Sequence, residues 1–524
     1  DQKYVVGYSL KPLSSAMSYG DCLIISPLIF MTVILGIKSK FMKIAIAWLF
    51  YGLSFFAYAE DNETLHATGP LSAEEVLQSA AKHYPKILEN IAKYRAAEAR
   101  TLSAEGAFDL IFEVDSYNRA EGFYDGRSLE GTASRYLNSK GGAQVYGGYK
   151  LSNGTFPVYE DKRFTNTGGQ LNLGVLFSLL RDRNIDPRRF NVSDARLAAR
   201  EAEFDVLLTK LGIAQKAMIA YWRWLALGQK TGVYSNLLSI ALEREIGLKK
   251  EVEQGARAAI VLTESLQNIT QRKSLLANAE RDFAIAANEL SLFYRDGAGN
   301  PAIVSEKALP DYEPVINPID KFYELQDLNA LYASRPELKQ LRNSITRAMR
   351  RIELNQNSLL PRLDLDFGIS QPLGTIGEGG SSRDETDVII GLKFTIPLEQ
   401  RAARGALAEN EAELDALKQE ERLMQDQIQL EVRNILLDLR TAEKLLLLAK
   451  DEVNQSEALR KAEIRRFKKG ASDFFLVNIR ENTAAEAKVR FFLAGLQREV
   501  AQTNFDAATA NLKKLGINGS INNN

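Results

Sequence analysis

Four segments of the chain alternate between apolar and polar side chains with a period of two, which predicts strands with one apolar face. They lie within residues 110–115, 171–179, 362–370 and 388–396. Strands of about ten residues with an apolar and a charged face are typical of membrane β-barrels, but a half-buried soluble sheet shows the same alternation. The apolar faces consist of Leu110, Phe112, Val114, Leu171, Leu173, Val175, Phe177, Leu179, Leu363, Leu365, Phe367, Ile369, Val388, Ile390, Leu392, Phe394 and Ile396. The charged residues on the opposite faces are Glu113, Asp115, Arg362, Asp364, Asp366 and Lys393.

The number of these strands limits how they can span a membrane. Single-chain barrels begin at about eight strands, and lipid does not tolerate open strand edges, so four strands cannot close a barrel alone. If the strands cross a membrane, several chains must pool them, and three chains of four strands would supply twelve. Residues 118–168, between the first two segments, are rich in Gly, Asn, Ser and Tyr and therefore predict a surface loop.

Two long stretches of the chain predict unusually long helices. Apolar residues recur every three or four positions within 191–255 and 402–470, as in an amphipathic helix. At 1.5 Å per residue each helix would reach roughly 100 Å, which suits coiled-coil packing better than a compact domain. Proline, the strongest helix breaker, supports this prediction: all 14 prolines lie at or before Pro397, and none lies between Pro187 and Pro301.

The chain also contains an internal repeat. Each copy predicts a helix, a strand, a loop, a second strand and two long helices joined by a glycine turn. We expect a first copy at 60–317 and a second at 318–524, connected through the proline-rich stretch 296–320, with a longer loop inside the first copy. The matching segments are 84–87 with 335–338, 173–177 with 390–394, and 253–256 with 468–471.

The N-terminal region has the features of a targeting sequence. Residues 42–59 combine a short basic start, an apolar core and the small-x-small site Ala57-Tyr58-Ala59, which predicts a secretory signal peptide cleaved after Ala59. Residues 1–41 would then be an upstream extension of no assigned role. In the competing interpretation, the apolar run 23–37 belongs to a longer membrane anchor.

Composition and motifs give little sign of catalysis. The chain has 66 Lys and Arg against 67 Asp and Glu, which argues against nucleic-acid binding. Its two histidines, His66 and His83, and single cysteine, Cys22, offer too few ligands for a metal site or a thiol nucleophile. The carboxylate pairs on the first and third strands resemble those of a glycosidase, but a water-filled lumen explains them better. We therefore expect no enzyme activity, no cofactor and no metal.

Taken together, the order of these features resembles the TolC-like outer-membrane factor family over about Leu71 to Leu515. The residues that carry the resemblance are the repeat, the exits from the strands at 179–186 and 394–398, and the two tip turns. The resemblance implies a homotrimer with a 12-stranded barrel in the outer membrane of a Gram-negative bacterium, continued by a helical barrel in the periplasm. It also implies a passive exit duct that docks a periplasmic adaptor and an inner-membrane pump or ABC exporter, in efflux or type I secretion. The docking turns would comprise Gln254, Gly255, Ala256, Arg257, Lys469, Gly470, Ala471 and Ser472.

Around the tips the chain departs from the charged gate of the family. Members carry a tyrosine, an arginine and two aspartates around the second tip glycine, and an aspartate after the first. The residues at these positions here are Phe467, Ser472, Leu476, Ile479 and Val261. Because this charged latch is not reproduced, we expect Leu476 and Ile479 to form an apolar constriction that gates by dewetting. The expected gate comprises Val261, Phe467, Asp473, Leu476 and Ile479.

Two other classes of protein are compatible with part of these patterns. A structural or adhesive exported coiled-coil protein without channel activity explains the helices, but it leaves the charged strand faces unexplained. An exported hydrolase would use the carboxylate pairs, but the sequence lacks the surrounding catalytic motifs. The exported cargo, the energy source of the inner-membrane partner and the true translation start do not follow from the sequence.

Overall fold

A computed structural model describes residues 69–139, 141–316, 327–377 and 385–517. The described residues belong to one compact unit, Thr64–Asn524. The predicted extension 1–41, the predicted signal peptide 42–59 and His66 lie outside the described residues.

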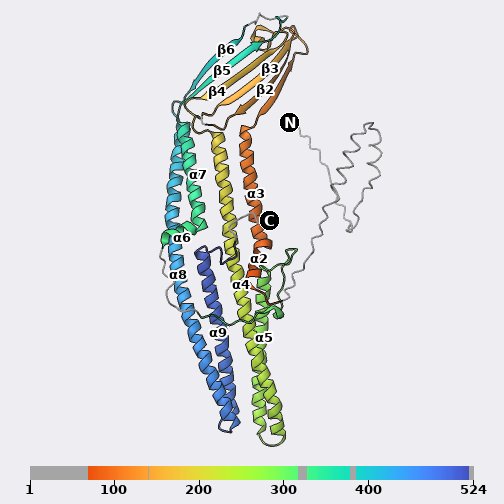
Figure 1. Cartoon of the computed structure of the whole chain (residues 1–524), viewed down its shortest axis with the longest axis vertical. Coiled ribbons are helices and arrows are strands. Elements are labelled where there is room, and N and C mark those ends of the chain that lie inside the picture. Colours follow the sequence, from red (N-terminus) through yellow and green to blue (C-terminus); the bar gives the residue numbers. More distant parts are fainter. Residues whose placement is uncertain (1–68, 140, 317–326, 378–384, 518–524) are drawn as a thin grey trace, which may run out of the picture. The chain divides into compact units, whose positions relative to one another are not determined.

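Helices appear twice in the same order, and we call Ala73–Ser291 the first set and Leu328–Ala508 the second set. In each set a short and a medium helix precede the strands, and two long antiparallel helices follow them (Figure 1). The division into copies at 60–317 and 318–524 stays a prediction. The helices of the first set are α2 (Ala73–His83), α3 (Pro85–Glu105), α4 (Pro187–Glu253) and α5 (Ala259–Ser291). Those of the second are α6 (Leu328–Ser334), α7 (Pro336–Ser358), α8 (Arg401–Lys468) and α9 (Phe474–Ala508).

The two longest helices confirm the prediction made from the proline gaps: α4 has 67 residues and α8 has 68. Helix α4 packs along α5 and α8 along α9, and α4 also contacts α9, so the two pairs lie side by side (Figure 1). The core lies along the inner stripes of these helices, where Trp224, Leu290 and Leu439 are completely buried. Three short 3₁₀ turns, Gly106–Phe108, Val158–Arg163 and Glu306–Ala308, lie in the connections. No helix in the described part of the chain is both long and apolar enough to cross a membrane.

The strands form one antiparallel sheet in which each strand pairs with its neighbours in chain order, from β1 to β6 (Figure 1). The mixed α and β fold is therefore confirmed, but the described residues contain six strands where the alternation predicted four. The prediction of a surface loop at 118–168 is wrong, because β2 and β3 form a hairpin there. The strands are β1 (Ile111–Asn118), β2 (Arg127–Tyr136), β3 (Gln144–Asn153), β4 (Gln170–Ser178), β5 (Arg362–Pro372) and β6 (Asp387–Thr395).

Candidate channel wall and tip turns

The two faces of the sheet differ in chemistry along its whole width. Residues directly opposite each other in a ladder share a face, so the register assigns every strand position to one side. One face is mainly apolar and exposed, and in the described strands its only charged residues are Arg127 and Arg135 at the two ends of β2. Phe112 and Ile390, on the two edge strands, each expose 70% of their surface there. The other face is polar and carries all six charged residues predicted for a lumen: Glu113, Asp115, Arg362, Asp364, Asp366 and Lys393.

The polar face holds contacts that cross several strands. The Tyr146 hydroxyl on β3 donates to Asp366 Oδ1 on β5 at 3.0 Å, passing over Gly174 on the intervening strand β4. A Cβ atom at position 174 would overlap the Tyr146 ring, so the glycine makes this crossing possible. On β2 and β3, Glu130 and Lys150 form an ion pair of 3.1 Å. The carboxylates of this face are thus partly held by neighbouring side chains, as expected for a structured polar surface.

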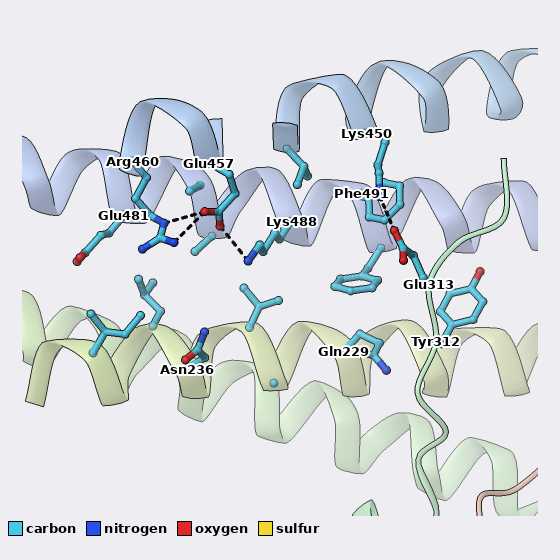
Figure 2. A pocket seen from close by; sticks show the side chains of 18 of the residues that line it. Gln229, Asn236, Tyr312, Glu313, Lys450, Glu457, Arg460, Glu481, Lys488 and Phe491 are labelled. Atoms are coloured by element: carbon cyan, nitrogen blue, oxygen red, sulfur yellow. Dashed lines mark hydrogen bonds and ion pairs between the residues drawn. The ribbon is translucent and has the colours of Figure 1, made fainter. Parts of the chain in front are cut away.

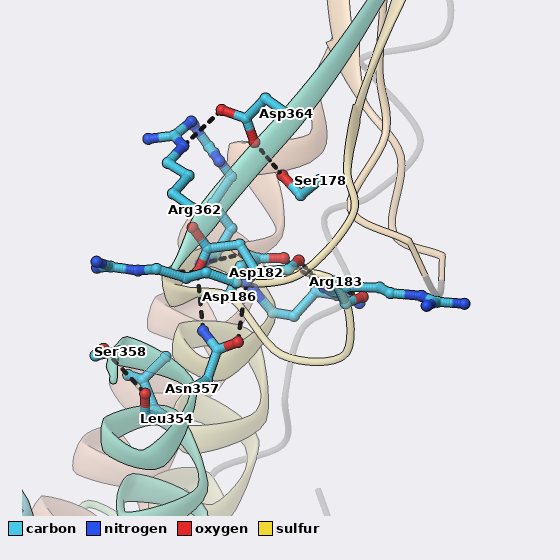
Figure 3. A network of polar contacts seen from close by, with 12 residues as sticks. Ser178, Asp182, Arg183, Asp186, Leu354, Asn357, Ser358, Arg362 and Asp364 are labelled. Carbon is cyan, nitrogen blue, oxygen red and sulfur yellow. Dashed lines mark hydrogen bonds and ion pairs between the residues drawn. The ribbon is translucent and has the colours of Figure 1, made fainter. Parts of the chain in front are cut away.

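A second polar network joins the sheet to the helices (Figure 3). Ser178 Oγ on β4 and Arg362 Nε on β5 both donate to the Asp364 carboxylate, at 3.1 and 2.6 Å. Below them, Asp182 and Asn357 exchange two hydrogen bonds of 2.9 Å, which ties the exit from β4 to the last turn of α7. These contacts hold the start of α4 and the end of α7 next to each other under the sheet.

The two tip turns have the same backbone geometry. Gly255 and Gly470 both have a φ of +73°, the left-handed region that glycine adopts without strain. After Gly255, the Ala256 amide donates to the Glu251 carbonyl at 2.8 Å, and after Gly470 the Ala471 amide donates to the Arg466 carbonyl at 2.9 Å. The glycine amides also donate, Gly255 to the Val252 carbonyl and Gly470 to the Phe467 carbonyl, both at 3.0 Å. The two hydrogen bonds of each turn together form a Schellman motif. The repeat therefore reproduces the same backbone turn at both tips.

Side chains of the two tips meet within the chain. Arg257 of the first tip lies over the Phe467 ring of the second, 5.2 Å from its centroid, and its Nε donates to Glu251 at 2.5 Å. The structure therefore brings together two residues that the sequence placed in the docking turns and in the gate. The remaining residues of the expected docking turns also lie in these two turns, and their role in docking stays a prediction: Gln254, Gly255, Ala256, Lys469, Gly470, Ala471 and Ser472.

The other predicted gate residues lie beside the turns, at the start of α5 and α9. Asp473 caps α9: its Oδ1 atom accepts a hydrogen bond of 2.7 Å from the Leu476 amide. Leu476 and Val261 are half-buried, whereas Ile479 is exposed. Within one chain, Leu476 and Ile479 thus do not form a common exposed patch.

Sequence reasoning missed a buried ionic cluster above the tips. The Arg272 and Glu481 side chains, on α5 and α9, are each 1% exposed and pair at 3.1 Å. Arg244 on α4 donates to Glu481 Oε2 at 3.0 Å, and Arg272 also donates to the Leu237 carbonyl at 2.8 Å. Burial lowers the pKa of Arg272, and the adjacent Glu481 carboxylate opposes that shift. A signal was available, because both charged residues occupy positions in the buried, mostly apolar stripe of a helix.

A hollow of about 440 Å³ lies farther from the tips, between α4 and the α8–α9 pair (Figure 2). Several of its charged groups pair with one another: Glu457 accepts a hydrogen bond from Arg460 at 2.9 Å and forms an ion pair of the same length with Lys488. Burial favours a raised pKa for Glu457, but the hydrogen bonds from Lys488 and Arg460 outweigh it and lower the pKa. Among the described residues, no cluster of three or more His, Cys, Asp or Glu could hold a metal ion.

Comparisons with known proteins agree with this architecture. The family model described as outer membrane efflux protein matches residues 328–514. Among solved structures, the fold is similar to the CmeC outer membrane channel of Campylobacter jejuni (TM-score 0.56, 13% identity, 85% of this chain and 89% of that one). It is also similar to the outer membrane protein VceC of Vibrio cholerae (TM-score 0.56, 14% identity, 83% and 95%). The open state of the MtrE channel of Neisseria gonorrhoeae gives a TM-score of 0.55 at 12% identity, covering 85% and 89%. No curated protein sequence matches the chain significantly.

At these identities the structural matches establish the fold alone, and the family match covers the whole second set of elements, Leu328–Ala508. Both agree with the resemblance that the repeat, the strands and the tip turns indicate. The resemblance to the TolC-like outer-membrane factor family is therefore confirmed: residues 328–514 match the outer membrane efflux protein family model, and the chain has the fold of outer-membrane channels.

Proposed function

We propose that the chain is one subunit of a trimeric, passive exit duct in the outer membrane, through which a tripartite efflux pump or a type I secretion system exports its cargo. The sheet would lie in the outer membrane, and the helices would reach into the periplasm. The subunit makes and breaks no covalent bond, and the energy for export would come from an inner-membrane transporter, either a proton-driven pump or an ABC exporter.

One observation carries this proposal: an exposed apolar face runs across the whole described sheet, opposite a polar face with paired charges. A lipid-facing exterior and a water-filled lumen require these two faces. An adhesive coiled-coil protein gains nothing from large apolar side chains such as Phe112, Ile390 and Leu392 exposed on a sheet.

The tip turns support docking of a periplasmic adaptor. Both turns are held by the same Schellman motif, so they present two matching surfaces at the ends of helices of nearly equal length. We infer that the adaptor contacts Gln254, Arg257, Lys469 and Ser472, and that the Arg257–Phe467 contact holds the two tips of one chain together. The gate itself would form where Val261, Leu476 and Ile479 of the three chains approach one another.

Export to the outer membrane requires a targeting signal, for which the segment 42–59 is the candidate. Mass spectrometry of protein purified from outer membranes should find Glu60 as the first residue. Retention of residues upstream of Glu60 would contradict cleavage after Ala59 and would favour the longer anchor around 23–37.

The decisive experiment is to express the full chain in a Gram-negative host and to fractionate its membranes. We expect a heat-labile trimer in the outer-membrane fraction, extractable only with detergent, that gives discrete single-channel conductance steps in planar bilayers. Release by carbonate or urea, together with the absence of conductance from purified protein, would favour the adhesive alternative and overturn the proposal.

A further inference from the structure

We propose that the barrel of this assembly has 18 strands, six from each of three chains, and that it closes where β1 of one chain pairs with β6 of the next. The inference rests on the proposed trimer, but it concerns a separate property, namely the width of the barrel and the edges that join it. It differs from the 12-stranded barrel that four strands per chain would give.

The hairpin of β2 and β3 has the pairing expected of a barrel wall. Its strands pair with each other over ten residues, with β1 over eight and with β4 over seven, without a break in the sheet order. Each has 10 residues, a length that spans the hydrocarbon layer at the usual tilt. A hairpin that left the wall would lose both outer ladders.

The faces of the hairpin continue the faces of the other strands. Leu129 and Leu151 oppose each other on the apolar side, and Val145 opposes Val175 of β4 on the same side. All four are partly or well exposed, as a lipid-facing surface requires. On the polar side, Tyr146 reaches Asp366 on β5, so the hairpin is also fixed to a strand of the second set.

The two edges of the sheet are suited to each other. Almost every residue of β1 and β6 is exposed, and lipid does not tolerate unpaired strand edges. Because the sheet described here has an even number of antiparallel strands, β1 and β6 run in opposite directions. A neighbouring copy can therefore continue the ladder in the antiparallel sense, and a ring of copies can close.

Charge supports the same junction. Glu113 lies two residues from the helix-proximal end of β1, and Lys393 lies two residues from the helix-proximal end of β6. Both side chains are on the polar face, and within the described residues neither forms an ion pair. Pairing of β1 with β6 of the next copy would bring these opposite charges together at one level of the lumen.

The expected consequence is a wide barrel. Barrel diameter grows roughly linearly with strand number, so 18 strands give about 1.5 times the diameter of 12 strands. The distance between equivalent backbone positions in the three chains rises from about 21 Å to about 31 Å, for a strand spacing of ~4.8 Å and a tilt of ~40°.

Disulfide trapping tests the edges directly. Cys22 is the only cysteine of the chain, so variants in a Cys22→Ser background report only the introduced pairs. The first edge pair combines Glu113→Cys on β1 with Lys393→Cys on β6. To allow for a shifted register, Asp115→Cys replaces Glu113→Cys, or Gly391→Cys replaces Lys393→Cys, in further pairs on the same face of the sheet. A control pair, Thr132→Cys with Gly148→Cys, lies on directly opposed residues of β2 and β3 and should link within one chain. A third pair, Glu113→Cys with Asn172→Cys, reports direct pairing of β1 with β4.

Oxidation of the native outer-membrane assembly should give covalent trimers with an edge pair and no link between positions 113 and 172. Efficient 113–172 linkage would place the hairpin outside the wall and overturn the 18-stranded barrel, while leaving the trimeric duct intact. Failure of every edge pair in an assembly that conducts and is a heat-labile trimer would likewise overturn only the junction. Covalent dimers in which both edges of each chain are linked to the same partner, with no third chain, would overturn both the 18-stranded barrel and the proposed trimer.

Pulsed spin-label distances give an independent measure of the width. A label at Ile390→Cys, on the apolar face of β6, should report a distance between chains about 10 Å longer than a 12-stranded barrel allows. A distance that matches 12 strands would contradict the inference, and the mass of the same sample gives the number of chains.

Discussion

The three longest helices of the first set match those of the second within one or two residues, whereas the two sets differ in their strands. Helices α3 and α7 have 21 and 23 residues, α4 and α8 have 67 and 68, and α5 and α9 have 33 and 35. In the described chain, the first set contributes four strands to the sheet and the second contributes two.

The difference follows from geometry. Each residue lengthens a helix by 1.5 Å, so an unequal insertion in one coiled-coil pair would place the two tip turns at different levels. An added hairpin, by contrast, brings two strands and leaves the direction of the next strand unchanged. The sheet can therefore gain a hairpin without any change in the helices, while the helices must keep a common length.

The ionic cluster that joins the two sets should give the largest effect. In Glu481→Ala, Arg272 of the first set loses its partner while it remains buried, which should cost about 3–5 kcal/mol of the free energy of unfolding. Thermal unfolding of the detergent-purified chain, followed by its helical signal, measures this loss.

Two controls separate burial from charge. Arg490→Ala removes an ion pair of 2.7 Å between half-exposed side chains and should cost less than about 1 kcal/mol. The double variant Arg272→Met with Glu481→Leu should recover much of the stability, because it removes both charges and leaves neither partner buried without the other. Equal losses from Glu481→Ala and Arg490→Ala would show that the cluster does not couple the two sets.

Matched glycines on β4 and β6 should respond differently to the same change. The repeat aligns Gly174 with Gly391, but a Cβ atom at 174 would overlap the Tyr146 ring, whereas at 391 it would meet Asp366 Cβ at an ordinary 3.5 Å. Gly174→Ala should therefore destabilise the chain by about 1–3 kcal/mol, and Gly391→Ala should be nearly neutral. The same unfolding experiment measures both variants. A neutral Gly174→Ala would mean that the Tyr146 side chain does not cross β4 in the folded chain.

The tip glycines should instead behave alike in the two sets. Gly255 and Gly470 share a φ of +73°, and a Cβ atom would meet nothing within 4 Å at either position. Alanine at either site should therefore lower the free energy of unfolding by about 1 kcal/mol, through backbone strain alone. Gly247→Ala, within helix α4 and also in open space, is the control and should stabilise the chain by up to about 1 kcal/mol. Clearly unequal losses at the two tips would show that the turns are not equivalent.

The same contrast between helices and strands explains what the sequence could predict. The long helices were predicted at 191–255 and 402–470 and are found at Pro187–Glu253 and Arg401–Lys468, because helical periodicity and missing prolines extend over many turns. The strands of the second set were also predicted to within two residues, since large apolar residues alternate strictly with polar ones.

The hairpin was missed because its alternation has little contrast. Its apolar face includes Gly131, Ala133 and Gly147, and its polar face is rich in Ser, Thr and Gly, which is also the composition of a loop. Only the pairing with the neighbouring strands β1 and β4 shows that these residues are strands of the sheet. The ionic cluster was missed for a different reason: each charged residue interrupts a buried helix stripe, but its partner lies more than 200 residues away in the chain.

Glu457 should give the smallest effect, and its sign depends on pH. The folded state lowers the pKa of this carboxyl, because Lys488 and Arg460 donate to its charged form more strongly than burial opposes it. A lowered folded pKa contributes stability above the ordinary glutamate pKa of about 4.3, and this contribution is lost as the pH falls through the folded value. Glu457→Gln should therefore be less stable than the parent chain at pH 7 by roughly 0.5–1 kcal/mol, with a difference that shrinks below about pH 4. Denaturant unfolding at pH 7 and pH 3 measures both differences, and a constant difference would mean that Glu457 acts through packing between α8 and α9 rather than through its charge.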